Sequence, residues 1–139
     1  MDRNEAIKFL AIVKVAYPTA YRDMDNANKQ ATVNMWHISF PKTPFTVMSM
    51  AFDNFRRKSV FPPTVAEINE ELKNVHYKAL EDMQMARMYE NDDYKNNELW
   101  KKAKYIADVT FEFKHIDTRI NYGNINCKMI DSYYDEQKL

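Results

Sequence analysis

"PFTVMSMAFDNFRRKSVFPPTVAEINEEL" (residues 44–72) decides the fold class, because it predicts two amphipathic helices joined by a proline pair. In its first half, four large apolar side chains recur at intervals of three and four residues, which is the spacing of one helix face. They are Phe45, Met48, Phe52 and Phe55. In its second half, Thr64 and Glu67 form the T-x-x-E capping box that begins a helix. The stretch therefore predicts a helix, a short loop and a second helix.

The same spacing predicts three more helices, two before this stretch and one after it. Upstream we expect one helix over residues 4–17, capped by Asn4, and another over residues 25–38. The apolar face of the latter consists of Ala27, Ala31, Met35 and Ile38, with Trp36 and Phe40 at its end. Downstream, the helix that begins at Thr64 is expected to reach about residue 90, and a further helix covers residues 99–107.

The composition also favours helices, since the chain of 139 residues has a single glycine and 45% hydrophobic residues. We predict an all-α fold: a small helical bundle with one long fourth helix and a less regular C-terminal segment. The expected domains are a helical bundle at residues 1–90 and a C-terminal extension at residues 91–139. Val109, Phe111 and Phe113 alternate with polar residues as in a strand, and this alternative stays open for that short segment. Gly123 is expected in a turn.

Motifs of catalysis or cofactor binding are not found in the sequence. His37, His76 and His115 are too far apart for a zinc motif, and each is expected to be a surface or partly buried side chain. The glycine pattern of a phosphate-binding loop is missing, and no histidine is placed by sequence to activate Cys127. We therefore expect a protein that is not an enzyme and has no cofactor or metal.

Charge and cysteine content indicate where such a protein acts. Twenty basic and twenty acidic residues give a net charge of zero, so nucleic-acid binding over the whole surface is not favoured. With Cys127 as the single cysteine no internal disulfide forms, which suits a reducing cytoplasm. The apolar run at residues 7–13 is too short to span a membrane. The sequence predicts a soluble intracellular protein.

Two kinds of side chain are candidates for partner binding. Met85 and Met88 lie off the main apolar stripe of the long helix, where exposed methionines are typical of protein-binding surfaces. Three basic residues precede Phe61, which lies at the position of a hydrophobic staple, and three lysines follow Trp100. These basic residues are Arg56, Arg57, Lys58, Lys101, Lys102 and Lys104. They suit either the solvated surface of a helix or contacts with phosphates.

The order "VNMWHISF", "PFTVMSMAFDNFRRK", "FPPTVAEI" over residues 5–72 resembles the phage-encoded replicative helicase loader/inhibitor family. The resemblance implies a compact helical N-terminal domain and a protein that binds the hexameric, ATP-bound DnaB-type replicative helicase. It further implies that the protein holds the helicase inactive and delivers it to a replisome organiser on origin DNA, without an ATPase of its own. The expected location is the cytoplasm of the bacterial host, where a host replication protein is an alternative second partner.

From the residues and the resemblance together we predict a DNA-replication protein that acts through protein–protein contacts. Expected helicase contacts are Met85, Met88, Trp100 and Phe111, and expected contacts to a second partner are Arg56, Arg57, Lys58 and Phe61. Two alternatives remain open: a protein that binds single-stranded nucleic acid through its basic residues, and a small phage inhibitor of a host replication or defence protein.

Overall fold

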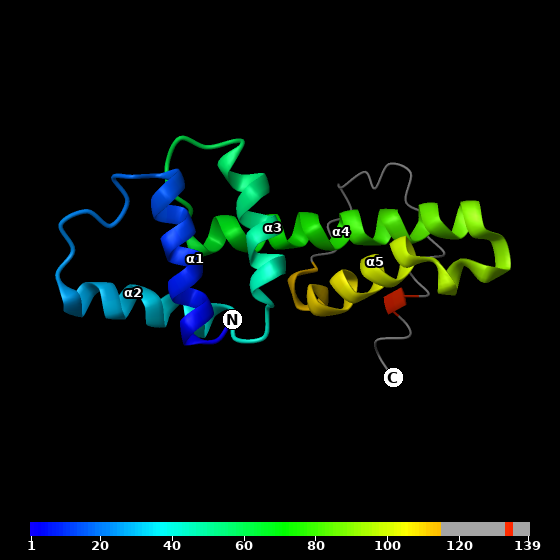
Figure 1. Cartoon of the computed structure of the whole chain (residues 1–139), viewed down its shortest axis with the longest axis horizontal. Coiled ribbons are helices and arrows are strands. Elements are labelled where there is room, and N and C mark those ends of the chain that lie inside the picture. The colour runs from blue at the N-terminus through cyan, green and yellow to red at the C-terminus, as the bar shows by residue number, and fades with distance from the viewer. Residues whose placement is uncertain (115–132, 135–139) are drawn as a thin grey trace. The chain divides into compact units, whose positions relative to one another are not determined.

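In a computed structural model of the chain, the described residues form five α-helices and two short 3-10 helices (Figure 1). The described residues are 1–114, except the side chains of residues 89–92, and 133–134. The elements are α1 (Arg3–Ala16), α2 (Asn26–Ser39), α3 (Phe45–Arg56), α4 (Val65–Glu90), η1 (Asn91–Asn96), α5 (Glu98–Val109) and η2 (Phe111–Phe113). The all-α prediction is confirmed, since this part of the chain contains no strand. None of its helices has the length and apolar content that a membrane span requires.

The chain divides into two compact units, Met1–Leu72 and Lys73–Leu139. The division lies within α4, whose first two turns belong to the first unit. The predicted domain boundary at residue 90 lies instead at the end of α4. That boundary concerns domains that fold independently, and it stays a prediction. Each unit is therefore considered by itself below.

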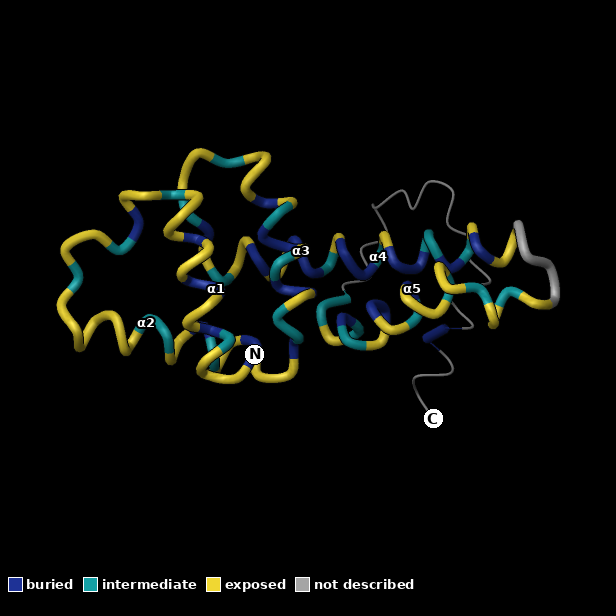
Figure 2. The backbone as a smooth tube through the Cα atoms, viewed as in Figure 1, coloured by how far each residue is buried: buried dark blue, intermediate teal, exposed yellow. Residues whose placement is uncertain are grey.

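An aromatic cluster forms the centre of the first unit. The ring centroid of Phe9 on α1 lies 5.2 Å from that of Trp36 on α2 and 5.8 Å from that of Phe52 on α3. Trp36 in turn stacks on Phe40 at 5.8 Å. All four side chains are buried, and Figure 2 shows buried positions recurring along α1 and α3. Other buried residues of this unit are Ala6, Leu10, Val13, Val47, Met48, Ala51, Phe55, Ile68 and Leu72.

Side chains cap the starts of α1, α2 and α4, whereas α3 begins after Pro44 without a side-chain cap. The cap predicted for α1 at Asn4 was wrong, because Asp2 precedes the first turn and forms a reciprocal capping box with Glu5. Asp25 caps α2 by accepting a hydrogen bond from the backbone N–H of Asn28. The capping box predicted for α4 is confirmed, with the N–H of Glu67 donating to the hydroxyl of Thr64 at 3.2 Å. The predicted length of this fourth helix is confirmed as well.

The apolar face predicted for the second helix faces solvent. Met35 and Ile38 are 49% and 71% exposed, and Ala27 and Ala31 are exposed with them. Trp36 determines instead which face of α2 turns inward, because an aromatic side chain buries far more area than two alanines. The prediction counted apolar residues and gave too little weight to their size.

The strand-like alternation at residues 109–113 does not form a strand. Val109 ends α5, and η2 continues the helical turn. The hydroxyl of Thr110 donates a hydrogen bond to the carbonyl oxygen of Ile106 at 2.6 Å, which satisfies a helix-terminal acceptor. The predictions for Cys127, for the turn at Gly123 and for the rest of the C-terminal segment lie outside the described residues.

Replacing Thr64 with alanine should lower the free energy of unfolding of the first unit by about 1 kcal/mol, since it removes the N-cap of α4. Urea denaturation followed by circular dichroism measures this change. Thr19→Ala, a change at an exposed loop position, is the matched control and should have little effect. Equal unfolding midpoints for the two variants would contradict the capping role.

Candidate partner-binding surface

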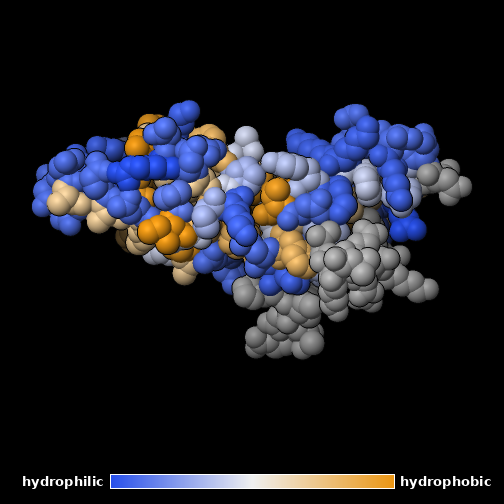
Figure 3. Space-filling view, turned by 90° about the horizontal axis from the view of Figure 1, so that it is seen from below, coloured by the Kyte–Doolittle hydropathy of each residue, from blue (hydrophilic) through white to orange (hydrophobic). Residues whose placement is uncertain are grey.

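An apolar groove of about 610 Å³ lies between α1 and α3 in the first unit. Phe9 and Phe52, two rings of the aromatic cluster, form part of its lining. Ile12, Val15 and Met50 also line it and remain exposed. The remaining lining residues are Ala16, Thr46, Ser49, Asp53 and Arg56. On the face drawn in Figure 3, the N-terminal unit carries separate apolar patches among hydrophilic side chains.

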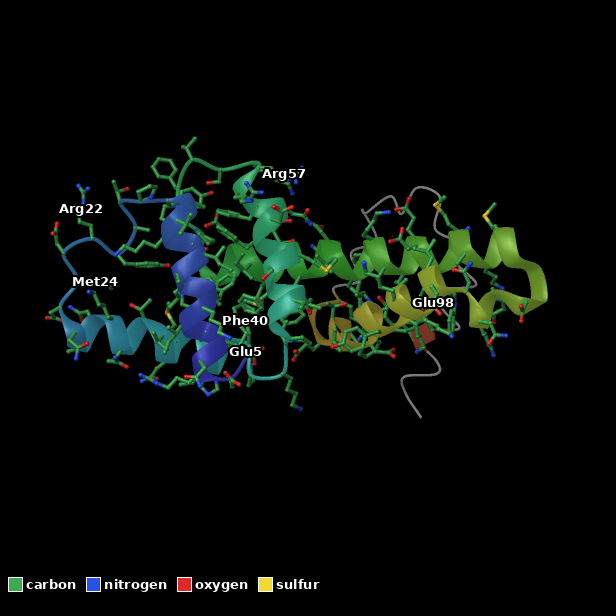
Figure 4. All side chains as sticks on the ribbon, in the orientation of Figure 1. Glu5, Arg22, Met24, Phe40, Arg57 and Glu98 are labelled. Atoms are coloured by element: carbon green, nitrogen blue, oxygen red, sulfur yellow. The ribbon has the colours of Figure 1, made fainter. Side chains whose placement is uncertain are left out.

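Two of the three basic residues at the end of α3 share one carboxylate. Arg56 and Arg57 lie 2.6 and 3.1 Å from the carboxylate oxygens of Asp53, one turn earlier on the helix (Figure 4 labels Arg57). The hydrogen bond from Arg56 holds the pKa of Asp53 below its usual range. All three side chains are exposed, so their pairing is screened by water and salt.

The third basic residue reaches a different helix. Lys58 donates a hydrogen bond to the carboxylate of Glu71 on α4 at 2.8 Å, although thirteen residues separate the two. The side chain of Glu71 is only 8% exposed, so this ion pair lies partly out of water. Three cations thus face two carboxylates at this corner, and a nucleic-acid phosphate would have to compete with both.

The loop that follows holds two large apolar side chains in solvent. Val60 and Phe61 are 84% and 73% exposed. Ser59 fixes the loop: its hydroxyl accepts a hydrogen bond from the N–H of Phe61 at 3.1 Å, and its carbonyl oxygen accepts one from the Tyr17 hydroxyl at 2.8 Å. Pro62 and Pro63 restrict the backbone further. The staple position predicted for Phe61 was wrong, because its ring is exposed rather than packed on α4.

The candidates in the second unit differ in exposure. Met85 and Met88 are exposed on α4, as predicted. Trp100 is half-buried against Tyr94, with ring centroids 5.5 Å apart and near-perpendicular planes. Phe111 is half-buried in an aromatic cluster with Tyr133 and Tyr134. Trp100 and Phe111 therefore pack within the unit, whereas the two methionines face solvent.

His76 lies at the centre of that cluster, and the prediction of a surface or partly buried side chain was wrong for it. It is fully buried, with Nδ1 3.0 Å from the hydroxyl oxygen of Thr110 and Nε2 2.9 Å from that of Tyr134. The Thr110 hydroxyl already donates its hydrogen bond to the carbonyl oxygen of Ile106. Nδ1 of His76 is therefore the donor to Thr110, and Nε2 accepts a hydrogen bond from Tyr134. Burial lowers the pKa of His76 to about 4. Its spacing of four residues from both Leu72 and Leu80, on the buried stripe, was the available sequence indication.

The lysines near Trp100 are also close to carboxylates. Lys101 lies 3.5 Å from Glu98, and Lys104 lies 2.8 Å from Asp108. Lys104 also lies 4.9 Å from the ring centroid of Tyr133, a cation–π distance. Lys102 is exposed. Within the described residues, no group of three histidine, cysteine or acidic side chains is placed to hold a metal ion.

Comparison with known protein families gives a match over the first unit. Residues 1–69 match the family of the N-terminal domain of the phage SPP1 helicase loader. This stretch covers α1, α2, α3 and the first turn of α4, and so contains the α1–α3 groove and the Phe61 loop. No curated protein and no solved structure matches the chain. The individual contact residues predicted from the sequence stay predictions.

Replacing Lys58 with alanine should destabilise the first unit by about 1–2 kcal/mol, because the buried carboxylate of Glu71 loses its cation. Arg57→Ala is the matched control and should change stability by less than about 0.5 kcal/mol, since that ion pair is exposed. Chemical denaturation of both variants measures the difference. Indistinguishable effects would show that the Lys58 ion pair adds nothing to stability.

Acidification should weaken the second unit. The pKa of His76 is about 4 in the folded chain and about 6.5 in an unfolded one, so the unfolded state binds more protons between these values. Stability is therefore lost as the pH falls from about 6.5 to 4, by on the order of 3 kcal/mol. Urea denaturation across this range should show a shallower pH dependence for His76→Gln. An NMR titration of the imidazole near pH 6.5 would contradict the expectation.

Proposed function

We propose that the chain, whose residues 1–69 match the family of the phage helicase loader N-terminal domain, binds, inhibits and loads the hexameric replicative helicase. In this proposal the chain contacts the ATP-bound helicase, keeps it inactive, and delivers it to a replisome organiser at the origin. It acts in the cytoplasm of the bacterial host through protein–protein contacts and catalyses no reaction itself.

The exposed ring of Phe61, on a loop whose backbone is held by hydrogen bonds and prolines, is the observation that carries this proposal beyond the family match. A loop whose backbone is already held by hydrogen bonds and prolines loses little backbone entropy when a partner covers its aromatic side chain. Such preorganised aromatic residues are typical centres of protein interfaces. Val60 beside it adds apolar area to the same loop.

We assign this loop, together with Arg56, Arg57 and Lys58, to the second partner, the replisome organiser. The side chains assigned to the helicase are Met85 and Met88, which are exposed on α4, together with the half-buried Trp100 and Phe111. Separate surfaces would allow the chain to contact both proteins during delivery.

The pairing of the basic residues disfavours the alternative of direct nucleic-acid binding. Arg56, Arg57 and Lys58 contact carboxylates within the chain, which lowers the charge available to phosphates. Salt-sensitive retention of the full chain on single-stranded DNA would nevertheless favour that alternative over the loader.

The central experiment mixes the full chain with the purified replicative helicase, with and without ATP, and measures the mass of the complexes by light scattering. We expect a complex only with ATP, together with slower strand unwinding. A helicase that elutes alone and unwinds DNA at its usual rate under both conditions would contradict the proposal. The inhibitor alternative would then be pursued by identifying what co-purifies from infected cells.

Phe61→Ala should weaken binding to the replisome organiser at least about tenfold, because it removes the central aromatic contact. Ile38→Ala is a matched control, since Ile38 is a similarly exposed apolar residue on α2 outside the loop. Titration calorimetry with the organiser measures both, and helicase binding should be retained in both variants. Equal affinity for wild type and Phe61→Ala would exclude the loop as the contact.

A further inference from the structure

A second groove, of about 280 Å³, lies between α1 and α2 on the other side of α1. It is lined by Ile7, Leu10, Ala11, Lys14, Tyr21, Met24, Lys29, Thr32 and Val33. Ile7 and Ala11 are exposed in its wall, while Leu10 is buried. The function proposed above does not use this groove.

The loop between the two helices holds a phenol in this groove. Tyr21 has a backbone φ of 61° and Asp23 one of 64°, both in the left-handed region that side chains disfavour. Tyr21 is partly buried and forms a hydrogen bond with Trp36 of the aromatic cluster. Burial raises the pKa of its hydroxyl above the usual range. The core thus positions one hydroxyl group in the groove, beside the apolar side chains of its lining.

The charges in the lining have one sign. Lys14 on α1 and Lys29 on α2 are its only charged residues, and both are exposed. The α1–α3 groove differs, because its charged lining residues, Asp53 and Arg56, pair with each other. Arg3 adds another cation between α1 and α2, where its guanidinium donates to the side-chain amide oxygens of Gln30 and Asn34 rather than to a carboxylate.

We propose that the α1–α2 groove binds an acidic amphipathic helix of another protein, with apolar side chains in the groove and carboxylates against Lys14 and Lys29. A groove between two packed helices can accept the apolar face of a third helix. The two lysines favour a helix with acidic residues beside its apolar face over one with basic residues there, because like charges across an interface repel each other.

Among the described residues, no segment of a second copy of the chain is well suited to fill this groove. The start of α4 is acidic and amphipathic, with Glu67, Glu70 and Glu71 near Ile68 and Leu72. Both of those apolar side chains are buried in the first unit and are not available to a second copy. The occupant is therefore assigned to a different protein, and self-association becomes one outcome of the test.

The test selects peptides from a displayed library of random sequences, about 16 residues long, against the immobilised full chain. We expect the enriched peptides to carry apolar residues at helical spacing and an excess of aspartate and glutamate. One enriched peptide is then synthesised together with a version in which lysine replaces each acidic residue, and fluorescence anisotropy measures the affinity of each. The lysine version should bind at least about tenfold more weakly.

Variants of the full chain locate the binding. Lys14→Glu with Lys29→Glu should weaken binding of the acidic peptide at least about tenfold, and Lys8→Glu with Lys42→Glu, at exposed positions outside the groove, should not. Ile7→Gln should weaken it as well, whereas Met35→Gln, at a residue of similar exposure on α2, should not. Phe61→Ala should bind the peptide normally, which separates this surface from the loop.

Several results would overturn the proposal. They are the enrichment of no peptides, the enrichment of basic or neutral ones, and an affinity that none of the groove variants changes. A concentration-dependent dimer of the full chain that Ile7→Gln abolishes would assign the groove to a second copy instead. Circular dichroism of every variant establishes that lost binding does not reflect lost folding.

Discussion

The ring of Phe9 contacts both Trp36 and Phe52, and the first unit depends on this double contact. Each aromatic pair contributes about 0.5–1.5 kcal/mol beyond the area it buries, and together they join α1 to α2 and to α3. Because the buried side of α1 is occupied by these rings, the flanks of the helix face outward. Ile7 and Ile12 lie on those flanks, each in the lining of a different groove. The packing that holds the unit together thus also creates its two candidate binding surfaces.

Features that depend on neighbours in the sequence were predictable. The stripe of Phe52 and Phe55 and the capping box of Thr64 and Glu67 are set by helical periodicity and by one local hydrogen-bonded turn, and both are present. The burial of Met48 and the exposure of Met88 follow from the same periodicity. These features gave the all-α class and the long fourth helix without any knowledge of tertiary contacts.

Features that depend on competition between distant residues were not predictable. The inward face of α2 was decided by Trp36 meeting Phe9, a contact between residues on different helices. The pairing of Lys58 with Glu71 crosses a loop whose path the sequence does not define. His76 is buried because Thr110 and Tyr134 satisfy both ring nitrogens, and only the folded second unit brings the three together. The partial burial of Trp100 and Phe111 was not predictable for the same reason, since it depends on aromatic residues that only the folded unit brings beside them.

Electrostatic differences among the surfaces of the first unit bear on how one small protein would distinguish its partners. At the end of α3, the cations pair with Asp53 and Glu71, so binding there would rely mainly on the apolar ring of Phe61. In the α1–α2 groove, Lys14 and Lys29 have no carboxylate beside them in the lining, so binding there would depend on charge and weaken with salt. Two surfaces that respond differently to salt suit two different partners. A chain of zero net charge can thus be selective through the local arrangement of its charges, although its total charge attracts no class of partner.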